Sequence, residues 1–132
     1  MRKITPLLYI GNMYAPQENG DEFDTVITLA PEEYPASTDV FLIPDGDHDY
    51  ALFEAAVETT IDSLQAGKKT LVHCQAGQSR SVSVAAAALA TVENIPLDTA
   101  FYRCENTGVR PHPDLVESAK RFTGDDNIPF SQ

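Results

Sequence analysis

The segment from residue 73 to residue 81, HCQAGQSRS, combines residue types that could bind an anion and react with it. Five residues separate Cys74 from Arg80, and an apolar run lies on each side of the segment. If a strand precedes this loop and a helix follows it, the loop amides can point inward toward an anion, and the positive end of the helix dipole adds to the attraction. Gly77 supplies backbone freedom. Arg80 can donate two parallel hydrogen bonds to the oxygens of a phosphate.

The same positive field makes Cys74 a candidate nucleophile. It favours the thiolate, the reactive form of cysteine, and a thiolate beneath a bound phosphate can attack phosphorus. The alternative is a buried structural cysteine followed by serine helix caps at Ser79 or Ser81. However, the pattern H-C-x-x-G-x-x-R-S fixes five positions, and a chance match in one such chain is rarer than about one in ten thousand. The pattern therefore predicts phosphate binding by Arg80 and by the loop residues Gln75, Ala76, Gly77, Gln78 and Ser79.

Such a loop needs a strand before it and a helix after it, and the flanking residues are of suitable types. Residues 70–73 are an apolar strand candidate, and residues 80–92 are almost all apolar, which predicts a buried helix. We expect other strands at 7–10, 25–29 and 39–43, other helices at 50–65, 97–104 and 114–122, and a short helix or a loop at 17–24. Strands alternating with helices predict one α/β domain with a central, mostly parallel sheet of about four to five strands.

Length and composition limit the classes of protein to consider. The chain has 132 residues, of which 42% are hydrophobic and 22% charged, as expected for one globular domain with a loose tail at 123–132. The N-terminal residues make a poor signal peptide, and no apolar run is long enough to span a bilayer, so we expect a cytoplasmic protein. Two cysteines are a weak disulfide framework, and without a CxxC or HExxH motif we expect no metal site.

The charge of the chain is strongly negative. Twenty acidic residues against nine basic ones give a formal net charge of −11, and such a surface repels nucleic acids and anionic membranes. We therefore expect neither as a partner. One explanation for the acidity is adaptation to a salty cytoplasm, since at 1 M salt the Debye length is only about 3 Å. The other is ordinary acidic solubility, and the sequence leaves both open.

The HCQAGQSRS segment resembles the phosphate-binding loop, HCxxGxxRS, of the cysteine-dependent protein tyrosine phosphatases. The flanking sequences are similar to the dual-specificity branch of that superfamily. Matching segments are ITPLLYIGN (4–12) for its opening strand, FDTVITLA (23–30) for the next strand, 41–74 for the acid loop, helix and strand, and RPHPDLVESAKRF (110–122) for the closing helix. The resemblance implies a protein-tyrosine-phosphatase-like fold and a single catalytic domain over 1–132.

The resemblance also implies a two-step reaction that requires no cofactor. Cys74 attacks a phosphomonoester while a protonated carboxyl group donates a proton to the leaving oxygen, and the phosphocysteine is then hydrolysed with the carboxylate as base. Arg80 and the loop amides stabilise the phosphoryl oxygens, and Ser81 matches the hydroxyl that stabilises the departing thiolate. The family places the acid after a strand and often after a proline, which favours Asp45 and leaves Asp47 as the alternative.

Three other residues have two interpretations each. His73 could tune the nucleophile through hydrogen bonds or simply be a satisfied core residue. Asn12 resembles a family asparagine that braces the loop, and it could equally be a turn residue after Gly11. Cys104 is expected to pack in the core, with a redox partnership with Cys74 as the alternative.

We expect the substrate to be a phosphorylated protein or peptide, carrying phosphotyrosine, phosphoserine or phosphothreonine, and the protein to be a monomer by default. Some relatives remove phosphate from RNA 5′ ends or from phospholipids. The scarcity of basic residues in the loop counts against such polyanions. A third interpretation, from another class, is a phosphate-binding module without catalysis. It predicts the loss of the nucleophile, the arginine or the acid, whereas Cys74, Arg80 and candidate acids are all present.

Overall fold

A five-stranded sheet forms the centre of the protein, with the strands in the order β1-β2-β5-β3-β4. The computed structural model describes residues 1–30, 35–105 and 109–125. The strands are β1 (Arg2–Lys3), β2 (Leu8–Gly11), β3 (Thr25–Thr28), β4 (Asp39–Val40) and β5 (Thr70–His73). All neighbouring strands are parallel except β1, which pairs antiparallel with β2. The expected α/β fold with a mostly parallel sheet is confirmed.

The register of the sheet brings three strand ends to the same edge. Gly11 of β2 and Thr28 of β3 both lie beside His73, the last residue of the central strand β5. Side chains and loops that follow these strands therefore meet at one edge of the sheet, the usual place for a site in a parallel α/β fold.

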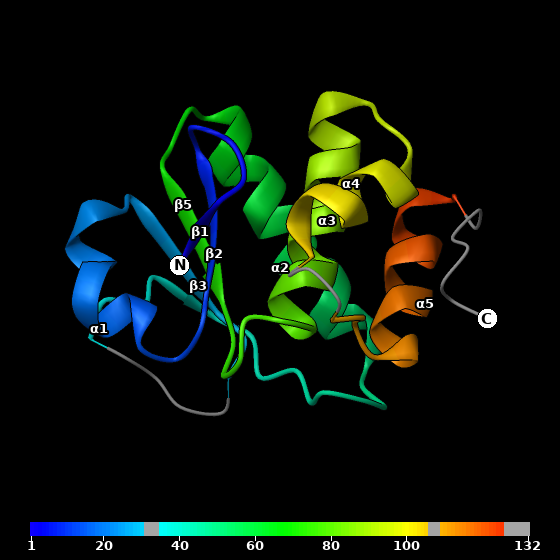
Figure 1. Cartoon of the computed structure of the whole chain (residues 1–132), viewed down its shortest axis with the longest axis horizontal. Coiled ribbons are helices and arrows are strands. Elements are labelled where there is room, and N and C mark those ends of the chain that lie inside the picture. Colours follow the sequence, from blue (N-terminus) through cyan, green and yellow to red (C-terminus); the bar gives the residue numbers. More distant parts are fainter. Residues whose placement is uncertain (31–34, 106–108, 126–132) are drawn as a thin grey trace.

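Helices cover both faces of the sheet (Figure 1). The short helix α1 lies on one side, and the longer helices α2 to α5 pack on the other. Their bounds are α1 (Ala15–Asn19), a 3₁₀ turn η1 (Gly20–Glu22), α2 (Tyr50–Gln65), α3 (Arg80–Glu93), α4 (Leu97–Cys104) and α5 (Pro113–Thr123). No helix within the described residues is both long enough and apolar enough to cross a membrane.

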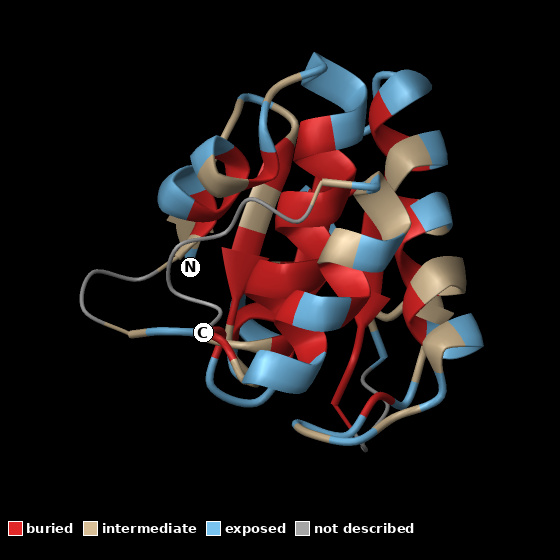
Figure 2. Ribbon diagram, turned by 90° about the vertical axis from the view of Figure 1, so that its right-hand side faces the viewer, coloured by how far each residue is buried: buried red, intermediate tan, exposed pale blue. Residues whose placement is uncertain are grey.

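Helix α3 is the central helix of the larger helical layer. Figure 2 shows it as a mainly buried element, and its residues from Arg80 to Ala90 are all buried. Five of these eleven residues are alanines and two are serines, so neighbouring helices can approach α3 closely. A helix enclosed in this way gives its first turn, at Arg80, a fixed position relative to the sheet.

The structure shortens one predicted strand, settles one segment that was left open, and adds a strand that was not predicted. The strand expected at 39–43 ends at Val40, because the chain leaves the sheet to reach Arg80, which donates a hydrogen bond to the carbonyl of Ile43. The segment at 17–24, expected to be a helix or a loop, contains the end of α1 and then η1. The edge strand β1 was not predicted, because its two polar residues carry no hydrophobic alternation.

The C-terminal boundary lies near the expected place. Helix α5 ends at Thr123, and the Asp125 carboxylate accepts a hydrogen bond from the amide of Leu97. These residues of the expected tail are therefore held against the start of α4. The remainder, 126–132, lies outside the described residues.

Candidate active site

The loop that joins β5 to α3 follows the central strand and ends at the buried helix. We call residues 74–80 the cysteine loop. Cys74 comes directly after β5, and Arg80 is the first residue of α3. Ser79 does not cap α3 with its side chain. Its hydroxyl oxygen instead accepts a hydrogen bond from the amide of His112, at 2.8 Å, which ties the cysteine loop to the segment before α5.

The sulfur of Cys74 has two polar neighbours. The amide of Gly77 donates to Sγ at 3.2 Å, and the hydroxyl of Ser81 lies 3.2 Å from the same atom. Cys74 is 2% exposed and Ser81 is fully buried. The Gly77 amide is a donor, and the Ser81 hydroxyl can also act as one. Thus Ser81 contacts the sulfur rather than acting as a helix cap.

Gly77 is needed at its position for two reasons. Its φ is +69°, in the left-handed region, and a Cβ there would lie 2.9 Å from the carbonyl oxygen of Gly11. The loop thus packs directly against the turn that follows β2, and the amide of Met13 donates to the carbonyl of Gln75 at 2.9 Å. Asn12 lies in this turn, but its side chain accepts from the amide of Tyr14. Its backbone lies against the loop, while its side chain stabilises the local turn.

Arg80 is held from outside the loop as well as within it. Its guanidinium donates to the carbonyl of Ile43 at 3.1 Å and to the side-chain oxygen of Gln75 at 3.4 Å. The residue is only 8% exposed. Because a guanidinium has five N–H donors in one plane, these contacts leave others for an anion above Cys74.

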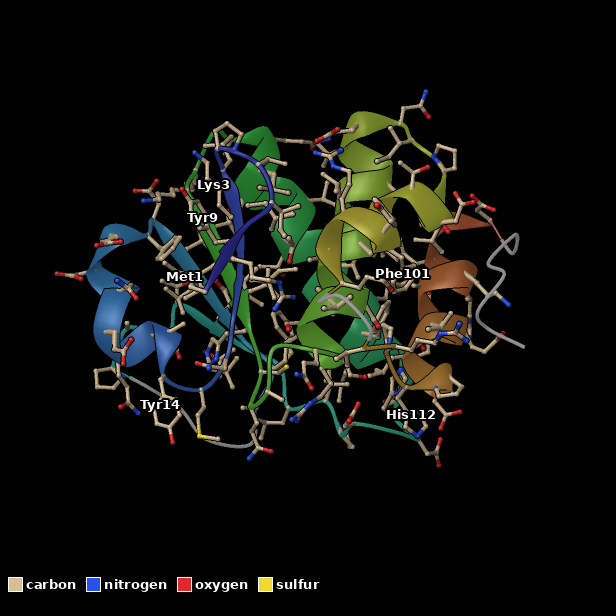
Figure 3. The ribbon with its side chains drawn as sticks, in the orientation of Figure 1. Met1, Lys3, Tyr9, Tyr14, Phe101 and His112 are labelled. Atoms are coloured by element: carbon tan, nitrogen blue, oxygen red, sulfur yellow. The ribbon has the colours of Figure 1, made fainter. Side chains whose placement is uncertain are left out.

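A pocket of about 370 Å³ opens above the sulfur. Figure 3 shows His112, one of its residues, at the edge of the molecule where the segment before α5 lies. The pocket is lined by Asp45, Cys74, Gln75, Ala76, Gln78, Ser79, Arg80, Val109, Arg110 and His112. It therefore combines the cysteine loop with a carboxylate and with two further basic side chains.

The three aspartates upstream of α2 have different surroundings. Asp45 lines the pocket together with Cys74. Asp47 instead lines a separate hollow with Tyr50 and Arg121, and Asp49 caps α2 by accepting from the amide of Ala51 at 3.0 Å. Of these three, the structure therefore brings Asp45 to the pocket.

His73 is a fully buried residue beneath the nucleophile position. Its Nε2 lies 2.7 Å from the hydroxyl of Thr28. Burial lowers the pKa of His73 to about 4, and a hydrogen bond with the backbone of Cys74 acts in the opposite direction. The imidazole is consequently neutral at physiological pH, and it joins β3 to the start of the cysteine loop.

Cys104, the second cysteine, lies at the end of α4 and is fully buried. Both cysteines are free thiols. Burial raises the pKa of Cys104 to about 12, in spite of the nearby Arg103 and Arg2. A thiol that remains protonated is a poor nucleophile, so packing describes this residue better than exchange with Cys74.

Three residues near the pocket were not singled out by the motif. Arg110 and His112 line the pocket, and the Arg-Pro-His-Pro run before α5 was the available sequence signal. Arg2 donates to the carbonyl of Gly77 within the cysteine loop, and nothing in the sequence indicated this contact. Among residues 1–30, 35–105 and 109–125, no group of three or more histidine, cysteine, aspartate and glutamate side chains is placed to hold a metal ion.

Residues 15–117 match the family described as the dual specificity phosphatase catalytic domain. The chain belongs to this family. It is 33% identical over 127 residues to the protein named "Putative tyrosine phosphatase 123R" of Invertebrate iridescent virus 6, with 91% of this chain and 89% of that protein covered. As a member of the dual specificity phosphatase family, the chain is a cysteine-dependent phosphatase.

Solved structures agree on the fold of this phosphatase. The crystal structure of human DUSP28 matches with a TM-score of 0.79 at 18% identity, covering 94% of this chain and 96% of that chain. The structure of Tk-PTP in the active form matches with a TM-score of 0.71 at 20% identity, covering 92% and 95%. The similarity spans almost the whole of each chain, so the chains share the same fold over nearly their entire compared length.

Proposed function

We propose that this phosphatase hydrolyses phosphotyrosine and phosphoserine or phosphothreonine monoesters in proteins through a phosphocysteine on Cys74. The observation that carries the proposal is the placement of the Cys74 sulfur, which has Gly77 and Ser81 donors at 3.2 Å and lies in a pocket shared with Arg80 and Asp45. A nucleophile, an anion-binding group and a proton donor are the three groups that the reaction requires.

In the first step, the thiolate of Cys74 attacks phosphorus and forms the S–P bond. The bond between phosphorus and the leaving oxygen breaks, and the carboxyl group of Asp45 donates its proton to that oxygen. Arg80 and the loop amides stabilise the charge on the equatorial oxygens. The products are a dephosphorylated hydroxyl group and a phosphocysteine.

In the second step, water attacks the phosphocysteine. The carboxylate of Asp45 accepts a proton from the water, and the S–P bond breaks to release phosphate and the thiolate. The hydroxyl of Ser81, which lies 3.2 Å from the sulfur, donates a hydrogen bond to the departing thiolate. His73 holds the first residue of the loop in place through its contact with β3.

A second candidate function has one observation in its favour. Arg110 and His112 bring further basic groups to the pocket, whereas the loop alone offers Arg80. Such groups suit a substrate with a second negative charge beside the phosphoryl group. Within the first candidate function this is an acidic phosphopeptide, whereas the second candidate is an RNA 5′ end or a phospholipid headgroup. The net charge of −11 disfavours the second candidate, because a polyanion or an anionic membrane would be repelled.

The test compares aryl phosphates with good and poor leaving groups. We expect Cys74→Ser to abolish hydrolysis of 4-nitrophenyl phosphate. Asp45→Ala should lower kcat/KM for phenyl phosphate, which reports the first step, by about a hundredfold, the usual contribution of a general acid, and should affect kcat/KM for 4-nitrophenyl phosphate much less, because the 4-nitrophenolate ion leaves without a proton. Asp47→Ala is the matched control and should leave both rates near the wild-type values.

Two outcomes would contradict the proposal. Full activity in Cys74→Ser would exclude the phosphocysteine, and a crippled Asp47→Ala beside a normal Asp45→Ala would identify Asp47 as the acid. Phosphotyrosine and phosphothreonine peptides, with and without acidic neighbours, then define the substrate class. Lower kcat/KM for the protein substrates than for RNA 5′ ends or phospholipids would favour the second candidate.

A further inference from the structure

Arg2 is a charged side chain that reaches the cysteine loop from a distant part of the chain. It belongs to the edge strand β1, where it pairs with Ile10 of β2. One of its guanidinium nitrogens, Nη2, donates to the carbonyl of Gly77 at 3.0 Å and to the carbonyl of Cys104 at 2.9 Å. A single side chain thus joins β1, the cysteine loop and the end of α4.

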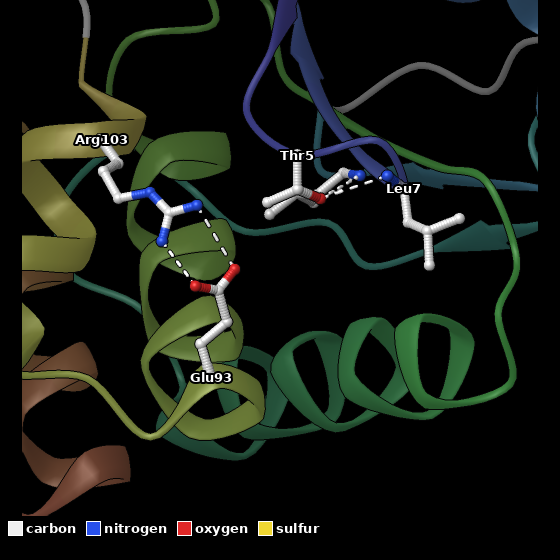
Figure 4. A network of polar contacts seen from close by, with 5 residues as sticks. Thr5, Leu7, Glu93 and Arg103 are labelled. Atoms are coloured by element: carbon white, nitrogen blue, oxygen red, sulfur yellow. Dashed lines mark hydrogen bonds and ion pairs between the residues drawn. The ribbon is translucent and has the colours of Figure 1, made fainter.

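The elements on both sides of this contact are themselves fixed (Figure 4). The hydroxyl of Thr5 accepts from the amides of Leu7 and Leu8, at 3.2 and 3.0 Å, which closes the turn between β1 and β2. On the other side, Arg103 of α4 forms a two-pronged pair with Glu93 of α3, at 2.7 and 3.3 Å. Arg2 therefore extends from a braced turn to a braced helix end, and its position is well defined.

The peptide group that Arg2 holds carries the next amide of the loop. The peptide bond between Gly77 and Gln78 is trans, so the carbonyl of Gly77 and the amide of Gln78 point in opposite directions. Because the carbonyl points to Arg2, the Gln78 N–H points away from Arg2. Gln78 is one of the residues that line the pocket, so this amide is available to a bound anion.

Gly77 makes this peptide easy to turn if nothing holds it. A glycine with a positive φ has little steric resistance to other conformations, and Gly77 has a φ of +69°. If the peptide flipped, the carbonyl oxygen of Gly77 would face the pocket in place of the Gln78 amide. A carbonyl oxygen repels a phosphate, so the orientation of this one peptide decides whether the loop attracts or repels its substrate.

We propose that Arg2 is a positioning residue of the phosphatase, which keeps the Gln78 amide turned toward the bound phosphoryl group by holding the carbonyl of Gly77. This inference rests on the proposed function of the cysteine loop as the phosphate-binding site. Arg2 also adds a positive charge behind the loop. Burial lowers its pKa, but a guanidinium stays protonated at neutral pH.

The test measures phosphate binding without catalysis. In a ¹⁵N-labelled Cys74→Ser protein, inorganic phosphate should move the backbone amide signal of Gln78 downfield, as a new hydrogen bond to an anion does. Adding Arg2→Met should weaken phosphate binding by about tenfold, the value of one hydrogen bond to a charged group, and should abolish the downfield shift of Gln78. In the enzyme with Cys74 intact, Arg2→Met should lower kcat/KM by a similar factor.

Two further variants make the test specific. Lys3 is the matched control, because it is the next residue of β1, is exposed, and points to the opposite side of the strand. Lys3→Met should bind phosphate as the parent protein does. Arg2→Lys keeps the charge and can hold one carbonyl, so its phosphate affinity should lie between those of the parent and Arg2→Met, with the Gln78 shift partly restored.

The outcomes separate this inference from the proposed function. If Arg2→Met has the same phosphate affinity and the same Gln78 shift as Lys3→Met, Arg2 is not a positioning residue. If circular dichroism shows Arg2→Met to be unfolded, Arg2→Gln, which removes the charge and shortens the side chain, takes its place. Parent-like phosphate affinity and Gln78 shift in folded Arg2→Gln would overturn the inference. Failure of the parent Cys74→Ser protein to bind phosphate, or an inactive wild-type enzyme, would instead contradict the proposed function.

Discussion

The contacts of single residues decide which chemistry the site can perform. Cys74 is almost completely buried, but its sulfur has an amide and a hydroxyl at 3.2 Å. These donors suit a sulfur that is alternately an attacking and a departing thiolate. Cys104 is also buried, and burial raises its pKa to about 12. The two cysteines therefore differ in their immediate polar neighbours rather than in their burial.

His73 makes stability depend on pH. Its pKa in the folded protein is about 4, against the usual value of about 6.5 in an unfolded chain. Between these two values the unfolded chain binds a proton that the folded protein does not bind. The free energy of unfolding should therefore fall by about 3 kcal/mol as the pH decreases from above 6.5 toward 4, and the full contribution of His73 is present above pH 6.5.

Urea unfolding of the wild type and of His73→Gln at several pH values between 4 and 7.5 measures this effect. Glutamine can hydrogen-bond to Thr28 but does not titrate. The stability difference between the two proteins should therefore shrink or reverse as the pH falls, while contributions from the acidic residues cancel. A constant difference across this range would show that His73 does not bind its proton more weakly in the folded protein.

Among the elements, the segment between β4 and α2 needs support from outside, because it carries Asp45 without regular secondary structure. His48 supplies one such support. Its Nδ1–H donates to the carbonyl of Gly46 at 2.6 Å, and its Nε2 lies 2.7 Å from the hydroxyl of Ser118 in α5. In the tautomer that carries its proton on Nδ1, Nε2 accepts from the hydroxyl of Ser118. A single side chain thus fixes the residue after Asp45 to α5.

Removing this support should impair proton donation more than phosphate binding. We expect His48→Ala to lower kcat/KM for phenyl phosphate by about tenfold, part of the full contribution of a general acid, and to change kcat/KM for 4-nitrophenyl phosphate and the affinity for inorganic phosphate very little. Ser118→Ala, which removes only one of the two hydrogen bonds, should have a smaller effect of the same kind. Steady-state kinetics with both substrates measures these ratios.

Glu117→Gln is the control, because Glu117 lies in the same helix next to Ser118, and its carboxylate pairs with Lys120 rather than with the loop. It should behave as the wild type. If His48→Ala slowed both aryl phosphates equally, the residue would support the fold or the phosphate site as a whole rather than the position of Asp45.

The regular elements could be predicted from sequence where hydrophobic patterns were strong. Helix α2 and strand β5 begin and end where expected, at Tyr50–Gln65 and Thr70–His73. Strand β1 was missed, since two polar residues at a sheet edge are stabilised by pairing with β2 and not by a pattern of their own. Its residue Arg2 was missed with it.

Like the fold, the site could be predicted from the sequence only in part. The spacing from Cys74 to Arg80 identified the loop because its residues are consecutive in sequence. The contacts that orient it come from other parts of the chain: Arg2 from β1, and His112 from the segment before α5. Such contacts depend on the packing of elements against one another, which local sequence patterns do not encode.

At the scale of the whole molecule, negative charge is the dominant feature. The formal net charge is −11. Two acidic clusters, at 18–24 and 45–49, contain only exposed carboxylates: Glu18, Asp21, Glu22, Asp24, Asp45, Asp47 and Asp49. Repulsion among such groups favours expansion of the chain, and salt weakens it. Two explanations account for such a surface, adaptation to high salt and ordinary acidic solubility.

The two explanations differ in how stability responds to salt. Raising the salt concentration from 0.1 to 1 M shortens the Debye length from about 10 Å to about 3 Å, so adaptation to salt predicts that the thermal unfolding midpoint rises by at least about 5 °C.

The triple variant Glu18→Gln, Asp21→Asn, Glu22→Gln removes part of the repulsion, and its midpoint should be higher in dilute buffer and rise less with KCl. Sucrose at equal osmolality stabilises through exclusion from the protein surface, so the wild type and the triple variant should respond to it equally. A midpoint that stays constant between 0.1 and 1 M KCl would favour ordinary acidic solubility, because the repulsion would then be too weak to limit the stability of the folded protein.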